Sequence, residues 1–179
     1  MKLFFNPKQL NLSKFQTQVS PQLVRGKAIH CPYMIYKMKQ NGVNQIIDLR
    51  NSAFFQSRLE KFYCKLFGIK YYNFKYSYRL YNLPEHDFFE KINNTIINND
   101  GQTYIHCQHG KRRTGICVAV YQKECLKKTY EEIFADLFNF GFRDMLTKKS
   151  QAKRKHLMSI YCDFVKRYYP QFAQTFGKE

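Results

Sequence analysis

HCQHGKRRTG, residues 106–115, joins a short apolar run to a longer one. The run before it, 103–105, is typical of a buried strand, and the run after it has the apolar content of a buried helix. Five residues separate Cys107 from Arg113 within this stretch. Backbone N–H groups at the N-terminus of a helix bind anions, because they point outward and the helix dipole is positive there. The stretch therefore predicts an anion-binding loop that also carries a thiol.

The residue types in this loop favour phosphoryl transfer. The thiolate is the nucleophilic form of cysteine, and a helix N-terminus lowers the pKa of a thiol such as that of Cys107. Arg113 presents a planar fork of donors that grips phosphate oxygens. Gly110 permits a tight turn with close approach of the backbone, and Thr114 offers a hydroxyl close to the sulfur. Together they suit transfer of a phosphoryl group to sulfur, followed by hydrolysis.

Two other interpretations of the loop are weaker. His106, Cys107 and His109 are metal-ligand types, but they crowd one turn and no second His/Cys pair has zinc spacing. A nucleotide-binding loop requires Ser or Thr after Gly-Lys, whereas Arg112 follows Lys111 here. We therefore expect neither a metal nor a cofactor. A buried core cysteine at position 107 is the remaining alternative.

Composition limits the class of protein. The 179 residues suit a single domain over 1–179, with a lead-in segment at 1–22 and a basic C-terminal helix at 148–169. The net charge of +17 predicts attraction to polyanions. No apolar run has the length of a membrane span, and the first residues are too soon polar for a signal peptide. We expect a soluble, cytoplasmic protein, a monomer, with reduced cysteines.

The pattern along the chain alternates strands and helices. Short apolar runs predict strands at 23–28, 43–49, 69–74 and 103–106. Helical spacing and end signals predict helices at 32–40, 53–67, 83–98, 114–126, 130–140 and 148–169. The alternation indicates an α/β fold with a central, mainly parallel sheet of about four or five strands flanked by helices. The loop at 106–115 then lies at the carboxyl end of a strand, where such sheets bind ligands.

The motif formed by His106, Cys107, Arg113 and Thr114 resembles the signature of the cysteine-dependent protein tyrosine phosphatase superfamily. Its compact dual-specificity branch is the most similar. Weaker similarity covers roughly residues 23–145, including 44–50, which ends in Asp-Leu-Arg. The resemblance implies that Cys107 is the nucleophile and Arg113 the phosphate clamp. It also implies that Thr114 assists breakdown of the phosphocysteine and that His106 orders the loop.

The sequence departs from the family pattern upstream of the loop. The family's aspartic general acid lies roughly thirty residues before the cysteine, but no Asp or Glu occurs between Glu60 and Glu85. Glu85, His86 and Asp87 are the nearest candidates, and we take Asp87 first. The alternative is that these residues are ordinary helix N-terminal polar groups. Without an acid, the site would prefer substrates with good leaving groups.

The loop residues Gln108, His109, Gly110, Lys111 and Arg112 are expected to bind the substrate phosphate together with Arg113. Lys111 and Arg112 add charge that the basic chemistry does not require, so they favour recognition of further negative charge or else point to solvent. A tyrosine or dual-specificity protein phosphatase is the first hypothesis. Phosphoinositide or inositol (poly/pyro)phosphate hydrolysis is the second. An RNA 5′-triphosphatase and a catalytically weak phosphate-binding module are further alternatives. The expected partner is a phosphorylated protein or an acidic, phosphate-rich substrate, ahead of an anionic membrane surface or nucleic acid.

Overall fold

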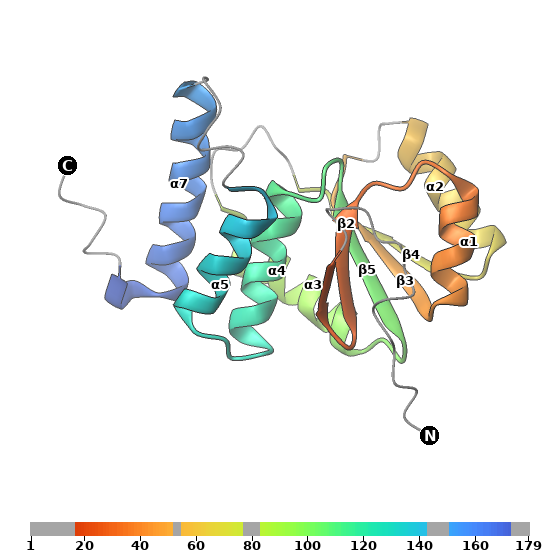
Figure 1. Cartoon of the computed structure of the whole chain (residues 1–179), viewed down its shortest axis with the longest axis horizontal. Helices are drawn as coiled ribbons and strands as arrows, with labels where there is room; N and C mark the ends of the chain where they lie inside the picture. The colour runs from red at the N-terminus through yellow and green to blue at the C-terminus, as the bar shows by residue number, and fades with distance from the viewer. Residues whose placement is uncertain (1–16, 52–54, 77–82, 143–150, 173–179) are drawn as a thin grey trace. The chain divides into compact units, whose positions relative to one another are not determined.

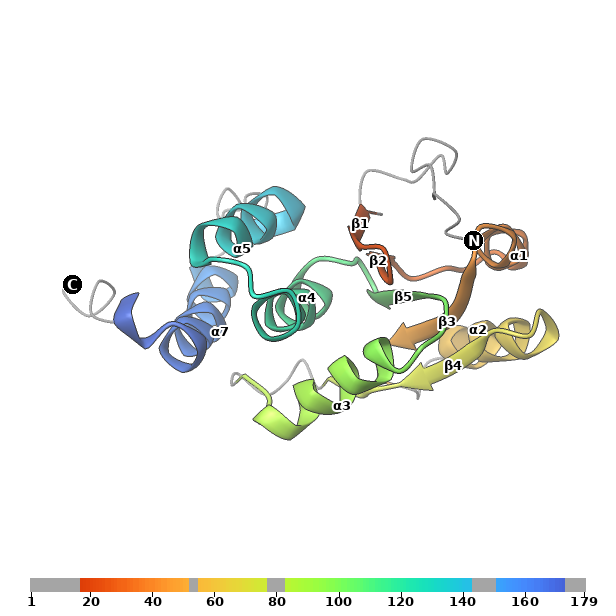
Figure 2. The same ribbon diagram turned by 90° about the horizontal axis from the view of Figure 1, so that it is seen from below.

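A computed structural model describes residues 17–51, 55–76, 83–142 and 151–172. The chain forms two compact units. The first comprises Met1–Tyr76 and Asn94–Thr114 and contains every strand found among the described residues. The second comprises Ser77–Asn93 and Gly115–Glu179. Figure 1 labels most elements of both units, and Figure 2 adds the label of β1. Among the described residues, no helix combines the length and the apolar character needed to traverse a bilayer.

The first unit is built on a five-stranded sheet with the order β1-β2-β5-β3-β4. Strands β2, β5, β3 and β4 run parallel, and β1 pairs antiparallel with β2 at one edge. Their bounds are β1 Thr17–Ser20, β2 Leu23–Lys27, β3 Val43–Asp48, β4 Lys70–Asn73 and β5 Gln102–Cys107. The predicted α/β class and the mainly parallel sheet are confirmed.

The lead-in predicted at 1–22 contains a strand, since Thr17–Ser20 form β1. This segment has no alternation of apolar and polar side chains, and its strand conformation depends on pairing with β2. Residues 1–16 of the expected lead-in lie outside the described residues.

Helices α1 (Pro32–Gln40) and α2 (Phe55–Leu66) cover one face of the sheet, as Figures 1 and 2 show. Pro32 opens α1, and Gly42, with φ of 91°, follows its end, as the sequence predicts. The core under these helices combines Val24, Ile35, Met38, Ile46, Cys64, Ile69 and Tyr104 with their neighbours. Burial of these side chains fixes both helices against the sheet.

The second unit is helical. It contains the first part of α3 (His86–Ile97), most of α4 (Arg112–Glu124), α5 (Tyr130–Leu137), the π-helical turn η2 (Phe138–Phe142) and α7 (Gln151–Tyr168). Thr129 begins α5 with a capping box to Glu132. The helix predicted at 130–140 is shorter in the structure, where α5 ends at Leu137. The next residues form η2, which includes Gly141. Aromatic rings hold α5 to the segment after α7, since Tyr130 lies 4.7 Å from Phe172 between ring centroids.

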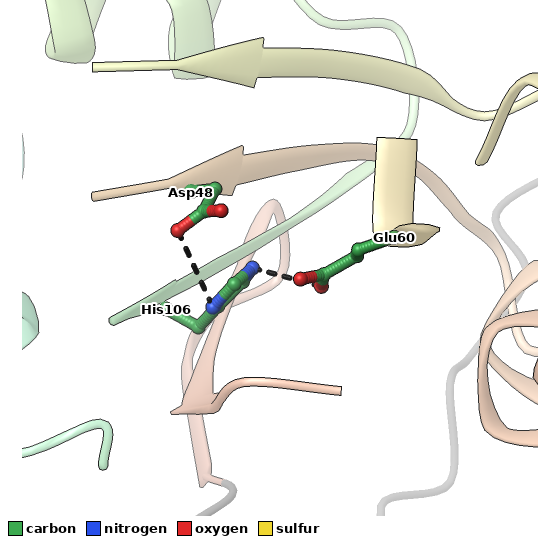
Figure 3. Close-up of side chains that lie close together, drawn as sticks. All are labelled: Asp48, Glu60 and His106. Atoms are coloured by element: carbon green, nitrogen blue, oxygen red, sulfur yellow. Dashed lines mark ion pairs between the residues drawn. The ribbon is translucent and has the colours of Figure 1, made fainter. Parts of the chain in front are cut away.

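A buried network of charges lies in the first unit, around the end of β5. In Figure 3, His106 lies between the carboxylates of Asp48 on β3 and Glu60 on α2. Its Nε2 lies 3.0 Å from Glu60 Oε1, and its Nδ1 lies 3.9 Å from Asp48 Oδ1. Arg50 donates through Nε (2.9 Å) and Nη2 (2.8 Å) to Asp48, and Nη2 also donates to Glu60. The hydroxyl of Tyr71 donates to Asp48 at 2.6 Å.

The network keeps its groups charged despite their burial. Burial opposes ionisation of Asp48, but the charge of His106 and the hydrogen bonds from Arg50 and Tyr71 lower the pKa of its carboxyl to about 2. Burial disfavours the imidazolium of His106, yet Glu60 and Asp48 raise the pKa of its ring above the ordinary value. Two carboxylates and two cations therefore compensate one another, and they join β3, α2 and β5.

Replacing Glu60 by Gln should destabilise the protein strongly. Removing one partner of a buried ion pair leaves the others without compensation, which costs about 3–5 kcal/mol. Urea unfolding followed by circular dichroism measures the loss. The matched control is Asp100→Asn, since Asp100 is 84 % exposed and pairs with Lys70 at 3.8 Å. A loss for Glu60→Gln no larger than that for Asp100→Asn would contradict this interpretation of the network.

Candidate active site

The loop between β5 and α4 lies at the carboxyl end of the central strand. Cys107 ends β5 and is 4 % exposed, and Arg112 begins α4. The neighbouring strands place Lys27 of β2 opposite Cys107 and Asp48 of β3 opposite His106. The predicted strand–loop–helix arrangement is present. The loop therefore meets the start of a helix at the edge where parallel sheets bind ligands.

Strand β2 holds the first half of the loop. Gly110 has φ of 67°, and a Cβ there would lie 2.3 Å from the carbonyl oxygen of Gly26, so no other residue fits without movement of the backbone. Arg25, which is buried, donates from Nη2 to the carbonyl of Gly110 at 3.0 Å. The N–H of Ala28 donates to the carbonyl of Gln108 at 3.3 Å. Carbonyl groups of the loop are thus turned toward β2, an arrangement that suits a loop whose N–H groups receive an anion.

The second half of the loop is held from β3. Arg113 donates from Nη1 to the carbonyl of Leu49 at 3.0 Å, and Leu49 in turn donates its N–H to the carbonyl of His106 at 2.9 Å. A guanidinium carries five N–H donors in a fixed fork, so this one bond orients the fork and leaves most of its capacity for a ligand. The segment after Asp48 therefore positions both the arginine and the strand that carries the thiol.

The surroundings of Cys107 favour its thiolate. Burial opposes ionisation of the sulfur, but the hydroxyl of Thr114, the charge of Arg113 and the backbone N–H groups of Thr114 and His109 outweigh it. The net effect is a pKa of Cys107 below its ordinary value. Cys64, on the buried face of α2, is the opposite case, because burial and the carboxylates of Glu60 and Asp48 raise the pKa of its thiol. The ionisation at Cys107 is thus a property of the loop rather than of burial.

Lys111 and Arg112 are partly buried residues of the same loop. Burial and the neighbouring charge of Arg113 lower the pKa of Arg112. Two guanidinium groups close enough to repel each other concentrate positive potential at the start of α4. This arrangement attracts a multiply charged anion.

The buried network adjoins Cys107, since His106 of the network precedes that cysteine in the chain. Ligand atoms of Asp48, Glu60 and His106 lie within 4.8 Å of one another, and these residue types also bind metals. However, Arg50 already contacts both carboxylates. A divalent cation would have to displace that guanidinium, so the cluster fits an ion-pair network better than a metal site.

The structure brings most of the predicted site residues together. His106, Cys107, Gln108, His109, Gly110, Lys111, Arg112, Arg113 and Thr114 all belong to the first unit. Asp87 belongs to the second unit, where it is exposed in the first turn of α3 beside His86 and Glu90. His86 pairs with Glu124 at 3.0 Å. Residues 77–82, in the region where the family has its general acid, lie outside the described residues.

Sequence reasoning missed three residues that support the loop: Arg25, Leu49 and Glu60. Arg25 lies in a predicted strand, but nothing local shows that its side chain is buried and bonds to the loop at Gly110. Leu49 contributes only its backbone, which no side-chain pattern reveals. Glu60 had a usable signal, because Ser57, Glu60 and Cys64 have the spacing of one helix face and that face is buried.

Solved structures with this fold include several phosphatases. The core catalytic domain of the PP-IP phosphatase SIW14 from S. cerevisiae, solved with citrate, is 23% identical, with a TM-score of 0.61 over 87% of this chain and 91% of that chain. TpbA from P. aeruginosa, solved with pTyr, is 12% identical, with a TM-score of 0.62 over 93% of each chain. A putative phosphatase from Shewanella putrefaciens is 15% identical, with a TM-score of 0.65 over 86% of this chain and 90% of that chain. At these identities the similarity shows the fold alone.

Sequence comparison supplies the family. No curated protein matches the sequence. The model of the tyrosine phosphatase family matches residues 23–139, which is more than half of the chain and includes the whole loop. That match, together with the parallel sheet and the loop between β5 and α4, shows that the chain belongs to the tyrosine phosphatase family.

Proposed function

We propose that this chain hydrolyses phosphate monoesters through a phosphocysteine intermediate. The Cys107 thiolate attacks phosphorus, the bond between phosphorus and the leaving oxygen breaks, and that oxygen takes up a proton. Water then attacks the phosphocysteine and releases inorganic phosphate and the free thiolate. The observation that carries the proposal is the lowered pKa of Cys107 in a loop where Arg113 is held by Leu49.

The supporting residues take distinct roles in this scheme. Arg113 neutralises the equatorial oxygens of the phosphoryl group as negative charge spreads over them in the transition state. Thr114 stabilises the sulfur as it leaves in the second step, because its hydroxyl lies beside the thiolate. His106 remains with the buried network and fixes the backbone from which Cys107 projects.

Replacing Cys107 by Ser should abolish release of phosphate from p-nitrophenyl phosphate, because a serine hydroxyl stays protonated in this loop. Rapid acid quench of the wild-type enzyme with ³²P-labelled substrate should trap label on the protein, and the variant should trap none. Equal turnover by the variant would exclude the phosphocysteine route. Absence of turnover by the wild type, with retained binding of phosphate, would instead identify a phosphate-binding module.

For the substrate, we propose a tyrosine-phosphorylated protein, with a dual-specificity range that includes phosphoserine and phosphothreonine. The family name and the pTyr complex of TpbA support this choice. One observation favours a second candidate, an inositol pyrophosphate. Arg112 lies close enough to Arg113 for their charges to interact, so the loop carries more positive potential than one phosphate requires. The SIW14 domain, a PP-IP phosphatase, shares this fold.

A release assay across phosphotyrosine and phosphoserine peptides, phosphoinositides, inositol pyrophosphates and triphosphorylated RNA separates these substrates. For a protein phosphatase we expect the highest kcat/KM on phosphotyrosine peptides, with Lys111→Gln changing it little. Preference for the pyrophosphate, with a loss of about tenfold or more in Lys111→Gln, would select the second candidate. Circular dichroism of the variant checks its folding.

We also propose Asp87 as the general acid that protonates the leaving oxygen. Asp87 is an exposed carboxyl at the start of α3. Between Glu60 and Asp87 the sequence holds one other acidic residue, Glu85. Asp87→Asn should lower kcat on alkyl phosphates by about 10²-fold or more, because such leaving groups need a proton. Glu90→Gln, an exposed carboxyl on the same helix, is the matched control. An unchanged kcat in Asp87→Asn would remove Asp87 from this role.

Thr114→Ala should shift the acid limb of the pH profile of kcat/KM to higher pH. The Thr114 hydroxyl is the largest of the groups that lower the pKa of Cys107, so its loss raises that pKa and reduces the thiolate at low pH. Thr114→Ser keeps the hydroxyl and should keep the profile near that of the wild type. A limb that stays in place in Thr114→Ala, whatever happens to kcat, would exclude this role of the hydroxyl.

A further inference from the structure

Helix α2 has two opposite faces with different surroundings. Ser57, Glu60 and Cys64 lie on the face that is buried. The opposite face carries an apolar stripe at positions i, i+4, i+7 and i+11, which recur on one side of a helix. The stripe residues and their exposed fractions are Phe55 72%, Leu59 38%, Phe62 59% and Leu66 63%. Scattered exposed apolar residues are ordinary, but four on one side of one short helix form a continuous surface.

Cations flank this apolar stripe. Arg58, Lys61 and Lys65 have the spacing of one helix face, lie beside the stripe and are exposed. The single carboxylate of α2, that of Glu60, is buried in the charge network. The neighbouring helix α1 adds exposed Lys37 and Lys39 and has no acidic residue. The exposed surface of these two helices therefore carries apolar side chains, and every exposed charge on it is positive.

Helix α1 also exposes aromatic residues. Tyr33 is 60 % exposed and Tyr36 is 42 % exposed. The ring of Tyr36 lies 5.6 Å between centroids from Phe67, which follows α2, so the two helices are linked at this point. Lys37 Nζ lies 5.6 Å from the centre of the Tyr33 ring. Tyrosine rings with one apolar and one polar end are typical of the boundary between water and lipid.

We propose that the apolar stripe of α2, with its flanking cations, docks the protein on an anionic lipid surface. An amphipathic helix of this composition lies in the plane of the interface, with its apolar side chains among the acyl chains and its cations at the lipid phosphates. The positive charge of this surface favours an anionic membrane over a second copy of the chain as its binding partner. A second copy would bring equal clusters of cations together without an exposed carboxylate on either helix, and the net charge of +17 adds to that repulsion. An anionic membrane complements both properties of the surface.

The chain has no tryptophan, which allows a direct test in the full-length protein. Phe62→Trp places the only tryptophan in the stripe, where it can be excited separately from the 14 tyrosines. Ile97→Trp places one at an apolar position of α3 that is 48 % exposed. With vesicles of phosphatidylcholine and phosphatidylserine, Phe62→Trp should shift its emission to the blue and be quenched by brominated lipid. Ile97→Trp should do neither, and vesicles of phosphatidylcholine alone should give a much weaker effect for both.

Co-sedimentation with the same vesicles tests the energetic contribution. Phe62→Gln/Leu66→Gln should weaken binding about tenfold or more, and Lys61→Gln/Lys65→Gln about fivefold per charge. The controls are Ile97→Gln and Lys166→Gln, and p-nitrophenyl phosphate turnover should be unchanged in all four variants.

Failure of the wild type to bind vesicles, or binding by the stripe variants equal to that of the wild type, would overturn the proposal. So would a stripe variant that dissociates a dimer but still binds vesicles. Cys107→Ser should bind like the wild type, so this result is separate from catalysis.

Discussion

The ion pair between His106 and Glu60 organises the interior of the first unit. It joins α2 to the end of the central strand, one residue before Cys107. Its charges are tolerated in the interior because Asp48 and Arg50 complete a compensated set of four, with Tyr71 donating to Asp48. A buried network of this kind contributes little net stability over apolar packing, but loss of one member is costly. Its role is therefore to specify one arrangement of β3, β5 and α2.

The position of the loop between β5 and α4 follows from this arrangement. The backbone that leaves β3 after Asp48 bonds to His106 through the N–H of Leu49 and to Arg113 through the carbonyl of Leu49. On the other side, Arg25 and Gly26 of β2 constrain Gly110. The loop is thus clamped between two parallel strands before any substrate binds. A clamped loop presents its donors without reorganisation, which is the condition under which electrostatic stabilisation of a transition state is largest.

Much of this could be predicted from the sequence. Pro32, Gly42 and Gly68 mark helix ends by their backbone requirements, and apolar runs locate the four parallel strands. The loop is predictable because local chemistry suggests a role for each of three residues: an ionised thiol at Cys107, a tight turn at Gly110 and a phosphate-binding fork at Arg113. The remainder depends on contacts between distant segments. Thr17–Ser20 become a strand only by pairing with β2, and the tie from Arg25 to Gly110 spans eighty-five residues. Glu60 is an ordinary helix residue until the fold buries it beside His106.

The contacts of the loop should ionise the Cys107 thiol, and its N–H groups and Arg113 should bind phosphate beside the sulfur. The rate of alkylation of Cys107 by iodoacetamide, followed by mass spectrometry of its tryptic peptide from low to high pH, measures the pKa of the thiol directly. We expect a midpoint below the ordinary value of about 8.5 and protection of the thiol by inorganic phosphate. A midpoint at or above that value, with no protection by phosphate, would contradict this expectation.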